Sequence, residues 1–383
     1  MTLEALTMEI LKKLMAQDTI NPPGNERRGA VCLKEIFDRE GIDCQIQDLG
    51  ENRANFIAQI GSGRPILEFS GHLDVVPCVG EWTHPPIQAT QEGAYIYGRG
   101  ACDMKGGVAA MCAAAILLHR NGKPLHGTLR LVFVADEEHA NKGMHAFLDS
   151  HEAADYTVLG EPTDLHVAIA HRGVARDYID LHGHACHAAL RTEQESSVTQ
   201  AARAVLAIGK LDEELLAIRH PILPPPSIVV TQMQGYEKDN VVPGTVRLLT
   251  DFRVLPGMTE QEARSRVDAA LAAAGLKGYT FEKRFYMPGG EVSADEPFVG
   301  LCCEVASQTS GGREETPRAF DASCEQCFLV EAGSKTVVLG PGSLEQAHTI
   351  DEFVEKEQLL SATALYQDLA IRVLVQGKLG AKA

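Results

Sequence analysis

The apolar segment at residues 66–69 leads into Ser-Gly-His-Leu-Asp, and this pattern constrains the fold more than any other part of the chain. The segment is short, apolar and followed closely by Gly71, which predicts a buried strand. That strand would place His72 and Asp74 just past its carboxyl end. Because side chains alternate along an extended chain, these two side chains should point the same way. Imidazole and carboxylate groups at a strand end are typical ligands of a divalent metal.

The same arrangement, an apolar segment followed by a turn and then an acidic or imidazole side chain, recurs along the chain. The further positions are Asp103 after segment 95–98, Glu138 after 129–135, Glu161 after 156–159, and His348 after 336–339. Open α/β sheets bind ligands outside the carboxyl ends of their strands. We therefore predict that these four side chains meet His72 at one edge of a sheet.

The charges of these side chains predict two metal ions rather than one. Two divalent cations carry four positive charges, which Asp103, Glu138 and Glu161 would balance together with one bridging hydroxide. His72 and His348 would be neutral ligands, one for each ion. Asp74 would accept the second N–H of the His72 ring, as groups behind metal-bound histidines usually do. Zinc suits this set of nitrogen and oxygen ligands, and cobalt or manganese could take its place.

The adjacent acids Glu137 and Glu138 cannot both bind one ion if the backbone there is extended, because they would face opposite ways. We predict that Glu138 is the ligand and that Glu137 is the general base. A base in this position would take a proton from the attacking water and pass it to the leaving amine. The resulting hypothesis is a hydrolase of amide bonds.

Strand and helix signals alternate over residues 1–174 and return after residue 289, which predicts an α/β sheet flanked by helices. Between them, residues 175–288 show the order β-α-β-β-α-β, which is typical of a ferredoxin-like domain. Thr259 and Glu262 predict a capping box at the start of a helix over 260–274. The predicted organisation is a catalytic domain in two parts, 1–174 and 289–383, with an inserted domain at 175–288.

The formal net charge of −17 argues against a nucleic-acid partner or an anionic membrane surface, because phosphates would be repelled. The amino-terminal segment is amphipathic and carries acidic residues near its beginning, which is unlike a secretion signal. The longest apolar run, at 108–118, is far shorter than the roughly 20 residues needed to span a bilayer. The ten cysteines lack the spacing of a zinc site and are expected to be reduced thiols. We predict a cytoplasmic protein.

The chain resembles a family of metallopeptidases in seven segments that cover nearly its whole length: SGHLDVVP, GRGACDMKGG, ADEE, GEPT, HGHACHAA, NVVPGTVRLLTDFRVLPG and LGPGSLEQAH. This family includes acetylornithine deacetylase, succinyl-diaminopimelate desuccinylase, aminoacylase and carboxypeptidase G. The resemblance implies a zinc-exopeptidase-like mixed sheet, with an inserted ferredoxin-like domain that acts as a lid and makes a homodimer contact. It also implies that the metal ligands are His72, Asp103, Glu138, Glu161 and His348, with Asp103 bridging two ions, Glu137 as base and Asp74 behind His72.

Within the inserted domain, the resemblance implies that His187 reaches the active site of a partner subunit and stabilises the tetrahedral oxyanion. Asn240 and Arg253 match residues that hold the carboxylate of the substrate, and the planar fork of an arginine suits that group. The acidic position that contacts substrate is either Asp321 or Glu325, depending on how the segment FDASCEQCF is aligned.

The predicted activity is removal of the acyl group from an N-acyl amino acid, with N-acetylornithine as the leading substrate and a role in amino-acid metabolism. The alternatives within the same family are a dipeptidase, a carboxypeptidase or a desuccinylase. A protein that binds metal or peptide without turnover is the alternative from another class, and the presence of Glu137 argues against it. No GxSxG segment occurs, which disfavours a serine hydrolase.

Overall fold

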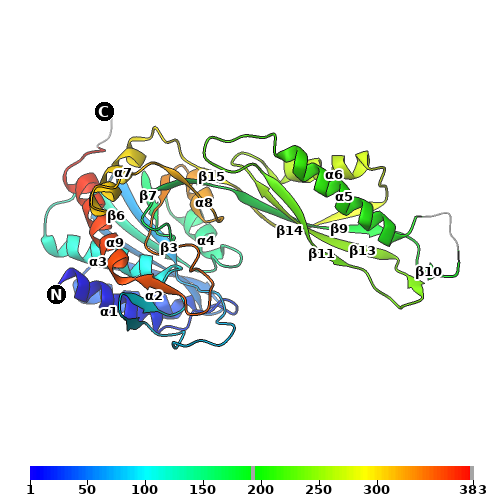
Figure 1. Cartoon of the computed structure of the whole chain (residues 1–383). Coiled ribbons are helices and arrows are strands. Elements are labelled where there is room, and N and C mark those ends of the chain that lie inside the picture. Colours follow the sequence, from blue (N-terminus) through cyan, green and yellow to red (C-terminus); the bar gives the residue numbers. More distant parts are fainter. Residues whose placement is uncertain (191–194, 380–383) are drawn as a thin grey trace. The chain divides into compact units, whose positions relative to one another are not determined.

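The computed structural model describes residues 1–190 and 195–379 (Figure 1). The chain divides into two compact units. Unit 1 consists of Met1–Ile169, Val292–Phe320 and Cys324–Ala383, and unit 2 of Ala170–Glu291 and Asp321–Ser323.

Unit 1 is built on a mixed sheet in which strands follow the order β1-β2-β6-β3-β7-β17-β8. Strand β3 pairs in parallel with β6 and with β7, and β17 pairs in parallel with β7. Every residue of β3 and β6 is buried, as expected for central strands that are covered on both faces. The bounds are β1 Asp43–Gly50, β2 Arg53–Ser62, β3 Ile66–His72, β6 Gly127–Val134, β7 Tyr156–Leu159, β8 Ala168–His171, β16 Arg318–Phe320 and β17 Lys335–Val338.

Helices cover both faces of this sheet, and the alternation of side chains along β6 shows how. Val132 and Val134 pack in one cluster with Phe147 of α4. Phe133 points the other way and stacks on Phe56, which in turn contacts Phe37 of α2. Helices α1, α3 and α9 pack against one another. The bounds are α1 Leu3–Met15, α2 Glu26–Glu40, α3 Lys105–Asn121, α4 Lys142–Ser150, α7 Pro297–Thr309, α8 Gln326–Glu331, α9 Lys356–Ala370 and the π-helical turn η1 Ile371–Val375.

A second, three-stranded sheet in unit 1 joins distant parts of the chain. Its order is β18-β5-β4, with β4 Thr90–Glu92, β5 Tyr95–Tyr97 and β18 Phe353–Glu355. Phe353 pairs with Tyr97, so the segment that precedes α9 lies beside the segment that leads into α3. The apolar pattern of Leu359, Leu365, Leu369 and Val373 predicts one long helix over residues 354–376. The helix α9 instead begins at Lys356, because residues 353–355 form β18 of this sheet.

Unit 2 has the order of elements predicted for a ferredoxin-like domain. Its antiparallel sheet follows the order β11-β13-β9-β14, and α5 and α6 pack on the sheet through buried residues such as Ile208, Leu271 and Leu248. The predicted capping box is present, because Thr259 and Glu262 each accept the backbone N–H of the other. The bounds are β9 Gly173–His182, β10 Cys186–His187, α5 Ser197–Leu215, β11 Ser227–Gln234, β12 Val241–Val242, β13 Thr245–Val254, α6 Glu260–Ala273, β14 Tyr279–Met287 and β15 Gly290–Glu291.

Two general expectations can be compared directly with the structure. All ten cysteines are free thiols. Within residues 1–190 and 195–379, no helix combines the length and apolar character that crossing a membrane requires.

Candidate metal centre

The five positions predicted to bind metal lie together in unit 1. The Nε2 atom of His72 is 3.1 Å from Oδ1 of Asp103 and 3.9 Å from Oε1 of Glu161. The Nε2 atom of His348 is 3.3 Å from Oδ2 of Asp103 and 3.1 Å from Oε1 of Glu138. Asp103 therefore contacts both imidazoles, one through each of its carboxylate oxygens.

Three of these side chains reach the cluster because neighbouring strands end there. His72 is the last residue of β3, and Glu138 and Glu161 follow β6 and β7, which flank β3 in parallel. Asp103 is positioned by a different part of the fold from the one predicted. It lies in the turn before α3, and the strand that precedes it, β5, belongs to the small sheet rather than to the main one. His348 lies in the loop between β17 and β18.

Burial and mutual contact set the electrostatics of the cluster. His72, Glu161 and Asp103 are 1%, 5% and 8% exposed, whereas the His348 side chain is 51% exposed. Burial alone would raise the pKa of Asp103, but hydrogen bonds with His348 and His72 outweigh it and lower that pKa. The same contacts with Asp103 and Glu138 raise the pKa of His348 to about 10. Burial raises the pKa of Glu161 well above its ordinary value, and the charge of Asp103 adds to this effect.

The chemistry of these residues fits a divalent cation. One ligand atom from each of His72, Asp103 and Glu138 lies within 4.8 Å of the others. Oε1 of Glu161 is buried and has no hydrogen-bond partner among the described residues. A buried, unpartnered carboxylate oxygen beside an imidazole and two further acids is unfavourable unless a cation balances it. Nitrogen and oxygen donors of this kind suit zinc and related ions.

The turn that carries the two adjacent glutamates differs from the extended backbone assumed in the sequence analysis. Residues 137–140 form a turn, and the preceding Asp136 has a left-handed backbone with φ 69°. Glu138 contacts His348 and Glu137 lies half-buried beside it. Burial raises the pKa of Glu137 to about 8. The negative charges of Glu138 and Asp103 act in the same direction, whereas the positive charge of His72 lowers this pKa.

Asp74 supports the cluster through a contact that was not predicted. Nδ1 of His72 is 2.9 Å from the backbone oxygen of Asp74, while the nearer carboxylate oxygen is 3.7 Å away. The carboxylate instead accepts the backbone N–H groups of Glu137 at 3.2 Å and Glu138 at 3.1 Å. Asp74 thus connects the end of β3 to the turn after β6.

A buried network that the sequence analysis missed extends behind Asp74. Asn21 donates to Asp74 at 2.9 Å and to Asp136 at 3.0 Å. Arg53 pairs with Asp136 at 2.9 Å and with Glu26 at 2.7 Å, and it donates to Asn21 at 2.8 Å. These side chains hold the turn before Glu137. The Asn-Pro-Pro-Gly segment signals a loop, but nothing in it indicates that Asn21 is buried.

The remaining predicted residues lie mainly in unit 2. His187 is on β10, and its Nε2 is 3.1 Å from Nδ2 of Asn240, while the backbone N–H of Ala189 donates to its Nδ1 at 3.1 Å. Arg253, on β13, pairs with Asp251 at 2.7 Å. These residues contact partners within their own unit.

The two candidates for the acidic substrate contact fall in different units. Asp321 belongs to unit 2 and Glu325 to unit 1. Glu325 is fully buried, and neither of its carboxylate oxygens has a hydrogen-bond partner among the described residues. Burial raises the pKa of Glu325 well above its ordinary value, and the charge of Glu137 adds to it. Glu325 therefore lies close enough to Glu137, the predicted base, for the charge of Glu137 to change its pKa.

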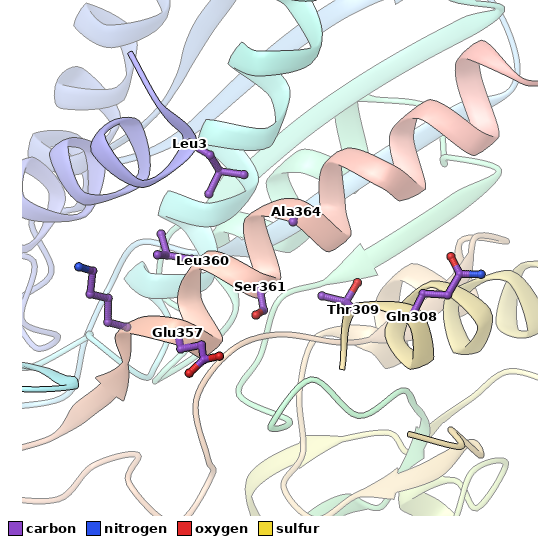
Figure 2. Close-up of a pocket in the computed structure, with 8 residues that line it drawn as sticks. Leu3, Gln308, Thr309, Glu357, Leu360, Ser361 and Ala364 are labelled. Atoms are coloured by element: carbon purple, nitrogen blue, oxygen red, sulfur yellow. The ribbon is translucent and has the colours of Figure 1, made fainter. Parts of the chain in front are cut away.

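A separate hollow of about 660 Å³ lies elsewhere on unit 1, along α9 (Figure 2). Its apolar lining residues are Leu3, Leu360 and Ala364. The other lining residues are Gln308, Thr309, Lys356, Glu357 and Ser361. The predicted catalytic, substrate-binding and metal-binding residues are absent from this set, so the hollow is distinct from the candidate metal centre.

Comparison with known proteins gives consistent matches along the chain. The profile of peptidase family M20/M25/M40 matches residues 69–372. A succinyl-diaminopimelate desuccinylase of Marinobacter nauticus is 27% identical, covering 96% of this chain and 98% of that protein. A probable succinyl-diaminopimelate desuccinylase of Staphylococcus aureus is 37% identical, covering 89% and 91%. An acetylornithine deacetylase of Vibrio atlanticus is 28% identical, covering 91% and 93%.

Solved structures show the same fold. A tripeptidase from Staphylococcus aureus has a TM-score of 0.77 at 20% identity, covering 96% of this chain and 98% of its own. A dinuclear metal-binding peptidase of the M20 family from Bacillus subtilis has a TM-score of 0.73 at 17% identity, covering 97% and 99%. These likenesses confirm the predicted class, a mixed α/β fold.

Proposed function

This chain belongs to peptidase family M20/M25/M40 and is a metal-dependent hydrolase of amide bonds, and from that premise we propose that it removes the acyl group from an N-acyl amino acid. The observation that carries this proposal is the cluster in which Asp103 contacts both His72 and His348. N-acetylornithine is the leading substrate, because the segments AHRG, RVLPGMT and LGPGSLEQAH most resemble those of acetylornithine deacetylase.

We propose that a pair of divalent cations binds here, with zinc as the leading candidate and cobalt or manganese as alternatives. Asp103 would bridge the ions, with His72 and Glu161 on one side and His348 and Glu138 on the other. The unpartnered oxygen of Glu161 and the contact of Asp103 with both imidazoles support this assignment. When bound, such ions lower the pKa of water and polarise the scissile carbonyl.

Glu137 is the proposed general base and acid. Its carboxylate would accept a proton from the attacking water and deliver it to the nitrogen of the leaving amine. In the metal-free protein burial raises the pKa of Glu137 to about 8, which shows that its surroundings favour the protonated form that would give the proton to the amine. Asp74 would orient Glu137, because its carboxylate accepts the backbone N–H groups of the turn.

Unit 2 would supply the groups that recognise the substrate. The Ala189 N–H donates to Nδ1 of His187, so the neutral ring carries its proton on Nε2. That proton would be donated to the Asn240 amide, turned so that its oxygen faces the ring, or to an oxyanion that takes its place. Arg253 and Asn240 would hold the α-carboxylate. As in the resembled family, we propose a homodimer formed through the inserted unit, in which His187 serves the active site of the partner copy. The ten free thiols support a cytoplasmic location.

Desuccinylation is the second candidate function, because two of the relatives above are named for it. A succinyl group has a second carboxylate, so its amide would need an additional cationic or hydrogen-bonding partner at the acyl end. A dipeptidase or carboxypeptidase activity is the third, since a tripeptidase shares the fold. All three activities would use the same metal-binding residues and base.

A substrate panel distinguishes these activities. The protein, with added zinc or cobalt, is incubated with N-acetylornithine, N-succinyl-diaminopimelate and a set of dipeptides, and release of acetate, succinate and amino acids is measured. We expect acetate release to have the highest kcat/KM. Faster succinate or amino-acid release would replace the leading proposal by the second or the third activity.

A further inference from the structure

A buried carboxylate next to the metal centre is fully occupied by contacts that the proposed chemistry does not use. Glu352 lies immediately before β18 and is completely buried. Its Oε1 accepts the backbone N–H groups of Gly100 at 3.0 Å, Cys102 at 2.9 Å and Asp103 at 3.0 Å. Its Oε2 pairs with Nη1 of Arg99 at 2.5 Å.

These contacts join two loops that are far apart in the sequence. The first loop carries Asp103, and the second carries His348 and ends at Glu352. Pairing of β18 with β5 brings the two loops side by side, and Glu352 then fixes the backbone of the first loop at three of its residues. Asp351 attaches the second loop to a third segment, because it accepts the backbone N–H groups of Thr83 and His84.

The position of the Asp103 backbone determines two contacts at once. One oxygen of Asp103 is 3.1 Å from Nε2 of His72, and the other is 3.3 Å from Nε2 of His348. A shift of the loop would change both separations. Metal sites tolerate only about 0.5 Å of displacement in their ligands before affinity falls.

We propose that Glu352 is a positioning residue of the metal centre, which fixes the Asp103 loop to the His348 loop and thereby sets the spacing of their ligand atoms. This inference rests on the proposed function, since it requires that Asp103 and His348 bind metal. Glu352 touches neither substrate nor metal in this scheme, because donors from the protein occupy both of its oxygens.

Two substitutions separate this role from a simple effect of charge. Glu352→Gln keeps the shape of the side chain but places an NH₂ group against Arg99 or against the backbone N–H groups. Glu352→Asp keeps the charge but withdraws the carboxylate by one methylene from the three N–H groups. If Glu352 acted only through its negative charge, Glu352→Asp would bind metal as tightly as the wild type.

Glu68 provides a matched control in the same unit. It is also fully buried and pairs with an arginine, Arg130, at 2.6 Å. Glu68→Gln should therefore destabilise the fold to a similar degree without moving either loop. It controls for loss of a buried ion pair as such.

The experiment measures zinc affinity of the metal-free proteins by calorimetry, the absorption spectrum of the cobalt-loaded proteins, and thermal unfolding without metal. We expect Glu352→Gln and Glu352→Asp to weaken zinc binding at least about tenfold and to alter the cobalt spectrum, as loss of groups behind metal ligands does. Glu68→Gln should leave both readouts within about twofold of wild type while it lowers the unfolding temperature.

Each outcome has a separate meaning. Wild-type zinc affinity in both Glu352 variants would overturn the positioning role and leave the proposed function intact. Equal loss of affinity in Glu68→Gln would also overturn it, because the effect would then be general destabilisation. A wild-type protein that binds no zinc, cobalt or manganese would refute the proposed function itself. If Glu352→Gln does not fold, Glu352→Asp decides between the first two outcomes.

Discussion

The residues proposed for catalysis in unit 1 and those proposed for recognition in unit 2 differ in how firmly the protein holds them. His72, Asp103 and Glu161 are buried and contact one another, and further buried groups hold their loops. His187 is exposed and Arg253 is partly exposed, and each is held by a few contacts within its own unit. The difference indicates that the chemical groups are arranged in advance, whereas the recognition groups remain free to bind a ligand.

The strongest test of this comparison replaces the proposed base. We expect Glu137→Gln to lower kcat about 10³-fold or more, because the amide cannot accept the proton of the attacking water. Zinc content, measured by elemental analysis, should stay that of the wild type. Glu138→Gln is the matched control at the adjacent position, and it should lose metal as well as activity. Unchanged turnover in Glu137→Gln would show that another group is the base.

A smaller effect is expected from the exposed histidine of unit 2. His187→Ala should lower kcat about 10²-fold, the usual cost of losing one donor to an oxyanion, with little change in zinc content. The matched control is His184→Ala, at an exposed histidine in the same segment, and it should keep its activity. If both variants lost activity equally, the effect would arise from the fold of this segment and not from a role of His187.

The effect expected for each pH unit is the smallest of the three, and it tests the electrostatic side of the comparison. The pKa of His348 is raised from 6.5 to about 10 in the metal-free protein, so its protonated form stabilises the fold fully below pH 6.5 and this contribution is lost as the pH rises through 10. Zinc must displace that proton, so the loss of the His348 proton alone should raise zinc affinity by up to about tenfold per pH unit between these limits. Calorimetry in buffers of different ionisation enthalpy measures the released protons; zinc binding without proton release would contradict the prediction.

The part of the site that follows from strand order could be predicted from the sequence. His72, Glu138 and Glu161 come after apolar segments, and the parallel pairing of β3 with its two neighbours brings the ends of those segments together. Asp103 joins them for another reason, the pairing of β5 with β18. That contact links distant segments and leaves no local pattern in the sequence.

The supporting groups could not be identified in this way. Asn21, Arg53 and Glu352 are polar residues that would ordinarily be assigned to the surface, and they are buried only because tertiary contacts supply partners for them. Asp74 was predicted to lie behind His72, but the sequence could not show that its carboxylate binds the turn at Glu137. That turn depends on the left-handed backbone of Asp136, which the neighbouring residues in the sequence do not indicate.

The same limits apply to the fold. Alternation and the capping box at Thr259 predicted the elements of unit 2, because its strands have one buried face and its helices have clear starts. The sequence did not predict the helices α4, α7 and α8, and α4 and α8 have only nine and six residues, too few for a clear periodic signal. The start of α9 was misplaced because β18 pairs with a distant strand.

The position of β17 between β7 and β8 has a consequence for synthesis of the chain. Most strands of the main sheet are synthesised before unit 2. The strand β17, which lies between β7 and β8, is synthesised only after the whole of unit 2. Unit 2 has its own core and can therefore fold while unit 1 still waits for that strand. Until then the edge of β7 that β17 will cover offers unpaired backbone groups, which could pair with another chain and lead to aggregation.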